Sequence, residues 1–171
     1  MPIKFKIHGN SVPVNGKPKY VVDDQALAYL ADTRSGAHLP SQRVGQTSLV
    51  AGTLQLEVSV PDGTVMWLWG YAPLSAWRRA SLIVPEAKHA ALTVVNPNIE
   101  AAKSVRLWPD DRISLMVDPS SGWFRLCDAT YSPREQGEMW IEFAQDTIAE
   151  LRADRLVAIF VRPENWKRLR L

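Results

Sequence analysis

The sequence predicts an α+β fold: an antiparallel, twisted sheet or a partly open β-barrel, with two to three helices packed against it. Three observations lead to this prediction. Short apolar runs alternate with polar residues at a period of two, turn residues recur at close spacing, and a few segments carry apolar residues at helical spacing. The chain shows no internal repeat and no linker, so we expect residues 1–171 to form one globular domain.

The N-terminal part is expected to begin with a strand and to continue into a helix. Residues 3–7 alternate apolar and polar side chains, which is typical of a strand with one buried face. Apolar residues at helical spacing predict a helix over residues 24–34, with Asp23 or Asp24 as its N-cap. The polar segment 36–48 is the longest candidate loop, and loops of this kind often carry functional residues.

Residues 54–71 form the best-specified element, a β-hairpin. Aliphatic and polar residues alternate through residues 54–60, which indicates a strand with one buried face. Pro61, Asp62 and Gly63 then provide turn chemistry, because proline fixes φ, aspartate can bond its own backbone and glycine reaches positive φ. The chain is therefore expected to reverse direction at this point.

A three-residue loop closed by Gly63 sets the register of this hairpin. Its core-facing pairs would be Val58 with Met66 and Leu56 with Leu68. The opposite face would carry an aromatic row of Trp67, Trp69 and Tyr71, because successive side chains of a strand point to opposite sides. A two-residue loop would shift the register by one residue and bury the aromatic row instead.

The aromatic row has two interpretations. Tryptophan and tyrosine are enriched at binding hot spots, which favours an exposed platform for a ligand or a protein partner. Alternatively, a helix or a second sheet covers this face, and the three rings belong to the core.

The middle of the chain is expected to alternate short helices and strands. A short helix is predicted for residues 72–79, and Asn96-Pro97 marks the start of another that runs to residue 104. The expected strands, separated by turn residues, are 81–84, 106–108, 112–117 and 123–127.

Near the C-terminus, Ser132-Pro133-Arg134-Glu135 matches a capping box, and apolar residues follow at helical spacing as far as Leu151. We therefore expect a helix here, while a strand over residues 139–143 is the competing interpretation. Residues 156–161 are apolar on both faces, which is typical of a central strand covered from both sides.

Composition excludes few classes of function. The formal net charge of +2 gives no global signature of nucleic-acid binding. Cys127 is the single cysteine, so an internal disulfide framework is impossible and a reducing compartment is favoured. No apolar run approaches the roughly 20 residues of a membrane span. These features predict a soluble, cytoplasmic protein with no membrane association.

Catalytic signatures are weak. Ser35 and His38 are close in sequence but lack a third orienting group, and Glu57 is a further poor candidate. The three histidines are widely separated, no metal-ligand or phosphate-loop spacing is present, and we expect no cofactor and no metal. Whether the protein is an enzyme is left uncertain, and the balance of these signals is against it.

Two segments combine basic and aromatic residues. Trp77-Arg78-Arg79 and the tail 166–170 have the cations and rings that single-stranded nucleic-acid binders use. The simpler interpretation is a solvated surface, because positive and negative charges nearly balance over the whole chain.

The sequence thus predicts a non-catalytic binding protein that presents an aromatic surface to a protein partner or to its own copy. The alternatives are a small enzyme whose site is assembled only in three dimensions, and a single-stranded nucleic-acid binder. The predicted binding residues are Trp67, Trp69, Tyr71, Trp77, Arg78 and Arg79.

Overall fold

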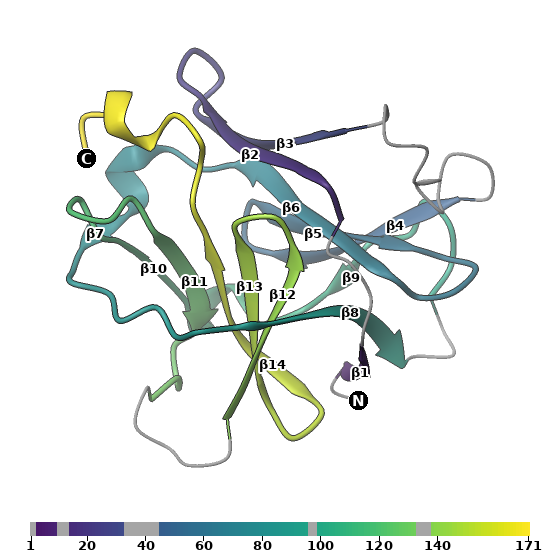
Figure 1. The fold of residues 1–171 in the computed structure, drawn as a ribbon. Helices are drawn as coiled ribbons and strands as arrows, with labels where there is room; N and C mark the ends of the chain where they lie inside the picture. The colour runs from purple at the N-terminus through teal and green to yellow at the C-terminus, as the bar shows by residue number, and fades with distance from the viewer. Residues whose placement is uncertain (1–2, 10–13, 33–44, 96–98, 133–137) are drawn as a thin grey trace.

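The structure is a computed structural model that describes residues 3–9, 14–32, 45–95, 99–132 and 138–171. Within these residues the protein is built almost entirely from β-strands, arranged in two sheets (Figure 1). The helical segments described are 3-10 turns of three residues each, η2 (Leu74–Ala76), η3 (Asp110–Arg112) and η4 (Trp166–Arg168). None of the described helices is long enough to cross a membrane.

The larger sheet has eight strands in the order β1-β8-β12-β13-β14-β11-β10-β7. Most neighbours are antiparallel, but β8 pairs with β12 and β7 with β10 in parallel. The strands are β1 (Lys4–Gly9), β7 (Arg78–Arg79), β8 (Lys88–Val95), β10 (Ile113–Val117), β11 (Phe124–Asp128), β12 (Glu138–Ala144), β13 (Thr147–Arg152) and β14 (Arg155–Val161).

The smaller sheet has six strands in the order β2-β3-β6-β5-β4-β9, with β4 and β9 parallel. Its strands are β2 (Gly16–Val21), β3 (Ala26–Ala31), β4 (Gln46–Ala51), β5 (Leu54–Ser59), β6 (Val65–Tyr71) and β9 (Val105–Arg106). Two isolated bridges, Val14 with Ala144 and Thr64 with Thr93, connect segments of the two sheets.

One hydrophobic cluster draws side chains from both sheets and forms the main core. Leu27 and Leu56 enter it from the smaller sheet, and Phe124, Phe143 and Ile159 enter it from the larger one. Each sheet therefore buries one face against the other.

A second, smaller cluster lies on the other face of the larger sheet. Its buried members are Cys127, Ile148, Ala158 and Phe160. Residues 80–87, which we call the crossing segment, run in front of this sheet from β7 to β8 as a teal trace in Figure 1. Val84 and Ala87 of this segment pack against the cluster. A segment without regular secondary structure therefore covers part of the sheet.

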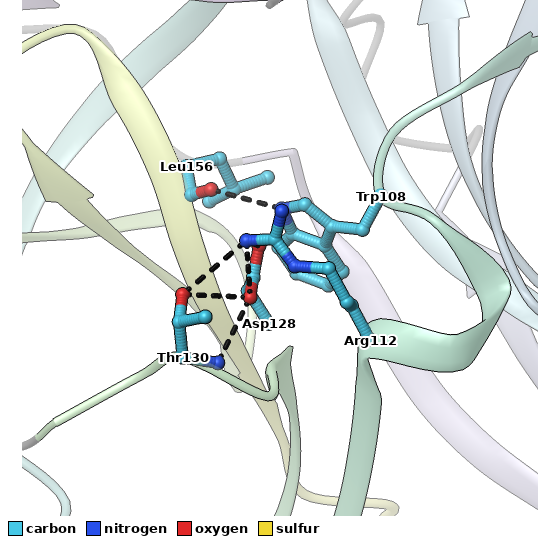
Figure 2. Close-up of polar contacts among 5 residues, drawn as sticks. All are labelled: Trp108, Arg112, Asp128, Thr130 and Leu156. Atoms are coloured by element: carbon cyan, nitrogen blue, oxygen red, sulfur yellow. Dashed lines mark hydrogen bonds and ion pairs between the residues drawn. The ribbon is translucent and has the colours of Figure 1, made fainter.

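An ion pair at one end of the larger sheet joins β11 to the start of β10. Nη2 of Arg112 lies 2.9 and 2.7 Å from the two carboxylate oxygens of Asp128, and Thr130 also donates to Asp128 (Figure 2). Nearby, the indole N–H of Trp108 donates to the backbone oxygen of Leu156 at 3.2 Å. Both carboxylate oxygens of Asp128 are thus matched with donors, as expected of a structural polar contact, whereas the buried Nε of Arg112 has no acceptor among the described residues.

The predicted α+β class, with two to three helices, is wrong. Residues 26–31 of the expected helix 24–34 form β3, and Asp23 and Asp24 lie in the turn before it. Aspartate favours turns and helix caps for the same reason, because its side chain bonds nearby backbone N–H groups. The pairing of β3 with β2 and β6 outweighs the local helical spacing.

The expected helix from residue 132 to 151 is also wrong. Residues 138–152 form the β12–β13 hairpin, so the competing strand interpretation of 139–143 was the better one. The proposed capping residues 133–135 lie outside the described residues, as does the Asn96-Pro97 helix start. Residues 99–104 contain a turn and no helix, and the segment 72–79 is reduced to η2 and β7.

Candidate functional site

The β5–β6 hairpin contains the predicted turn. The N–H of Ser59 donates to the oxygen of Thr64 at 2.9 Å, and the N–H of Gly63 donates back to Ser59 at 2.8 Å. Gly63 has a φ of 70°, and a Cβ at this position would lie 2.7 Å from the oxygen of Val94 in β8. Glycine is therefore required both by its backbone conformation and by close packing between the sheets.

The register of this hairpin differs from the prediction at one place. Leu56 pairs with Leu68 and Gln55 pairs with Trp69, as predicted. Val58, however, pairs with Val65 instead of Met66, because a β-bulge places an additional residue in β6 between these pairs.

Trp69 and Tyr71 are the exposed rings of the predicted aromatic row, with 38% and 50% of their surface accessible. The indole N–H of Trp69 donates to a carboxylate oxygen of Glu57 at 2.9 Å. Ser48 on β4 donates to the same oxygen at 3.1 Å. Glu57 is buried, so this network holds the ring of Trp69 in one orientation above the sheet.

Trp67 has a different environment. Its ring is half-buried and stacks on Tyr29, with 5.7 Å between centroids and 2° between planes. The hydroxyl of Tyr29 donates to the oxygen of Val14 at 2.6 Å, and burial raises the pKa of Tyr29 to about 12. Tyr29 also packs against the main core, so Trp67 connects the aromatic row to the interior.

Other apolar side chains are exposed on the β2–β3 hairpin beside β6. Ala26 of β3 pairs with Tyr71, while its neighbour Leu27 pairs with Gly70 and is buried in the core. Alternation along β3 therefore places Leu30 on the side facing away from the core, where 52% of it is exposed. We define the aromatic face by Leu30, Trp69 and Tyr71.

Trp77 lies apart from the aromatic face. It is 6% exposed and belongs to the main core, where its ring meets Phe124 edge to face at 4.9 Å between centroids. Arg78 and Arg79 are exposed on β7, the edge strand of the larger sheet. The structure therefore does not bring these three predicted binding residues together with Trp67, Trp69 and Tyr71, and most of the Trp77 ring is buried in the core.

Of the catalytic candidates, Glu57 is the one that lies within the described residues. Ser35 and His38 lie outside the described residues, and the carboxylate of Glu57 is engaged by Ser48 and Trp69. Cys127 is buried, and burial raises the pKa of its thiol, although the charge of Arg125 acts in the opposite direction. Within the described residues, no group of three histidine, cysteine, aspartate or glutamate side chains is placed to hold a metal ion.

A polar cluster on the outer face of the larger sheet was missed by the sequence analysis. The hydroxyl of Tyr131 donates to Glu150 at 2.7 Å, and Glu150 is fully buried on β13. The guanidinium groups of Arg125 and Arg152 lie 4.9 and 5.4 Å from the centre of the Tyr131 ring. Alternation in residues 147–152 would have placed Glu150 opposite the core, but the helical interpretation of this segment concealed it.

Comparisons with known proteins add no family assignment. No family model matches the chain, and no curated protein matches its sequence. The geometry of the site is therefore the basis for any functional conclusion.

Proposed function

We propose that the protein is a non-catalytic binding protein that engages a protein partner, or a second copy of itself, through the aromatic face of the smaller sheet. The observation that carries this proposal is the exposure of Trp69 and Tyr71 on β6, a strand whose Val65, Met66 and Leu68 are almost completely buried. Large exposed aromatics are typical anchors of protein interfaces.

The contacts that hold the side chain of Trp69 in place strengthen the proposal. Binding costs conformational entropy for each side chain that must be ordered, and an anchor already held in place avoids part of that cost. The hydrogen bond from Trp69 to Glu57, together with pairing of Trp69 with Gln55 on β5, supplies such support before any partner arrives.

The chemistry around the rings favours a protein surface. Leu30, on the same side of β3 as Ala26, adds an exposed aliphatic side chain to this side of the smaller sheet. Lys17, which pairs with Leu30 on the neighbouring strand, is already engaged by Glu164 at 3.4 Å. An apolar centre with a charged rim is the usual arrangement of a protein interface.

The test compares Tyr71→Ser with Ile83→Ser. Ile83 is the matched control because it is 90% exposed and lies on the crossing segment of the other sheet. Sedimentation of the purified protein over a range of concentrations measures self-association. A photo-crosslinking residue at position 30 of the aromatic face, introduced into the unsubstituted protein and into each variant, captures a partner in cells.

We expect Tyr71→Ser to reduce self-association or crosslinked partner about tenfold or more, because a hot-spot truncation costs about 2 kcal/mol. Ile83→Ser should leave both unchanged. Equal behaviour of the two variants, with unchanged thermal unfolding, would contradict the proposal. The test replaces Tyr71 and not Trp69, whose hydrogen bond to Glu57 would be lost. Tyr71 makes no side-chain hydrogen bond among the described residues, so Tyr71→Ser breaks none.

A further inference from the structure

A pocket of about 240 Å³ lies where the C-terminal segment meets the edge of the larger sheet. Figure 1 shows the C-terminus, in yellow, beside the turn that leads into β7. Leu74, Trp77 and Val117 contribute apolar walls. Its polar lining comes from Ser75, Arg79 and Arg170. The pocket therefore lies on the sheet that does not carry the aromatic face.

The charged side chains that line this pocket are both basic, and its lining also includes Leu171, the last residue of the sequence, which carries a carboxylate. Arg79 and Arg170 both line it, while its lining includes no acidic side chain. Among the described residues, neither guanidinium group has an ion-pair partner. Unpaired guanidinium groups that converge on one cavity favour an anion, because their planar donors match carboxylate and phosphate oxygens.

The wall of the pocket supplies a second observation. Trp77 is 6% exposed, and its indole N–H has no acceptor among the described residues. Buried donors without an acceptor are rare in folded proteins, so each requires an explanation. The same ring packs edge to face on Phe124, which fixes its position beside the two arginines.

We propose that this pocket binds a small organic anion, a phosphate monoester or a carboxylate with a compact apolar group. Arg79 and Arg170 would contact the anionic group, and the apolar group would rest on Leu74, Trp77 and Val117. The ligand is small because the pocket lies below the range of about 300–1,000 Å³ typical of drug-sized ligands.

Neighbouring residues provide a matched control for this proposal. Arg78 and Arg79 are adjacent on β7, are both exposed, and pair with Met116 and Val117 of β10. Arg79 lines the pocket, whereas Arg78 is absent from its lining. Arg78→Gln and Arg79→Gln therefore remove the same charge from the same strand but differ in access to the pocket.

The experiment titrates the protein of residues 1–171, tagged at residue 1 because Leu171 lines the pocket, with phenyl phosphate and benzoate. Inorganic phosphate serves as the probe that lacks the apolar group, and benzyl alcohol as the probe that lacks the charge. The readout is the indole N–H resonance of Trp77 in heteronuclear NMR spectra, assigned with Trp77→Phe, at constant ionic strength.

We expect saturable shifts of the Trp77 resonance with phenyl phosphate or benzoate. Whichever of these two compounds binds more tightly identifies the anionic group of the ligand as a phosphate or a carboxylate. Arg79→Gln and Arg170→Gln should each weaken binding about tenfold or more, the effect of losing a charge-assisted hydrogen bond. Arg78→Gln should weaken it less than twofold. Equal loss in Arg78→Gln and Arg79→Gln, equal affinity for inorganic phosphate, or the absence of a saturable shift with either anion would overturn the proposal.

Discussion

The backbone N–H of Leu82 donates a 3.1 Å hydrogen bond to the carboxylate of Asp118, 36 residues later in the chain. The other carboxylate oxygen accepts from the backbone N–H and the hydroxyl of Ser120, at 2.8 and 2.6 Å. One buried carboxylate therefore fixes both the turn between β10 and β11 and the start of the crossing segment.

The first prediction concerns this anchor. Asp118→Ala leaves the N–H groups of Leu82 and Ser120 without their acceptor, and we expect a loss of about 2–4 kcal/mol in the free energy of unfolding. Urea denaturation measures the loss, and hydrogen exchange should accelerate at Leu82. Asp110→Ala is the control, because the ion pair of Asp110 with Arg106 is exposed and should contribute at most about 1 kcal/mol. Equal losses in the two variants would contradict the assigned role of Asp118.

The second prediction is a decline in stability at acid pH. Hydrogen bonds from the Ser120 hydroxyl and the Leu82 N–H lower the pKa of Asp118. Burial raises the pKa of Asp128, but hydrogen bonds from the Thr130 backbone and from Arg112 outweigh this and lower it overall.

Because both pKa values are lower in the folded state, the stabilisation is complete above the unfolded value of about 3.9 and is lost as pH falls below it. Urea denaturation from pH 6 downwards, with about one-unit steps, should show this decline. It should be shallower in Asp128→Asn, which has one fewer titrating carboxyl group. An equally steep decline in the variant would exclude Asp128 as a contributor.

Local turn chemistry explains which parts of the fold the sequence could predict. The Pro61-Asp62-Gly63 turn and the turn from Asp118 to Gly122 both form, because their residues specify backbone conformation within a few positions. Residues 156–161 lie within β14, which is placed between β13 and β11 as a run apolar on both faces predicts. These signals require no knowledge of distant residues.

The failed helices show the limit of the same approach. Residues 24–34 and 138–151 contain apolar residues at helical spacing, but their strands pair with segments that the periodicity does not reveal. The turn residues of the hairpin likewise do not specify the bulge in β6, which moved the partner of Val58 by one residue. The burial of Trp77 depends on Phe124, 47 residues away in sequence.

The third prediction concerns the lone thiol. Cys127 is 2% exposed beneath the crossing segment, and burial raises its pKa. Because the thiolate is the reactive form, we expect native protein at neutral pH to react with a disulfide reagent far more slowly than urea-unfolded protein. Asp118→Ala should accelerate the reaction of the folded protein if release of Leu82 uncovers the thiol. A fast reaction of the native wild-type protein would show that this face is open.

The fourth prediction concerns the turn after β10. Gly122 has a φ of 76°, and a Cβ at this position would overlap the ring of Trp166. Gly122→Ala therefore combines a left-handed backbone conformation with a steric clash, and we expect a loss of about 2–4 kcal/mol in the free energy of unfolding.

Gly9→Ala is the matched control, because Gly9 ends β1 without a positive φ, and a Cβ at this position would have no atom within 4 Å. It should change stability by no more than about 0.5 kcal/mol. The double variant Gly122→Ala/Trp166→Ala separates the steric clash from the backbone strain, since removal of the ring relieves only the clash. If the double variant is no more stable than the sum of the single losses predicts, contact with Trp166 is not the reason that glycine is needed at this position.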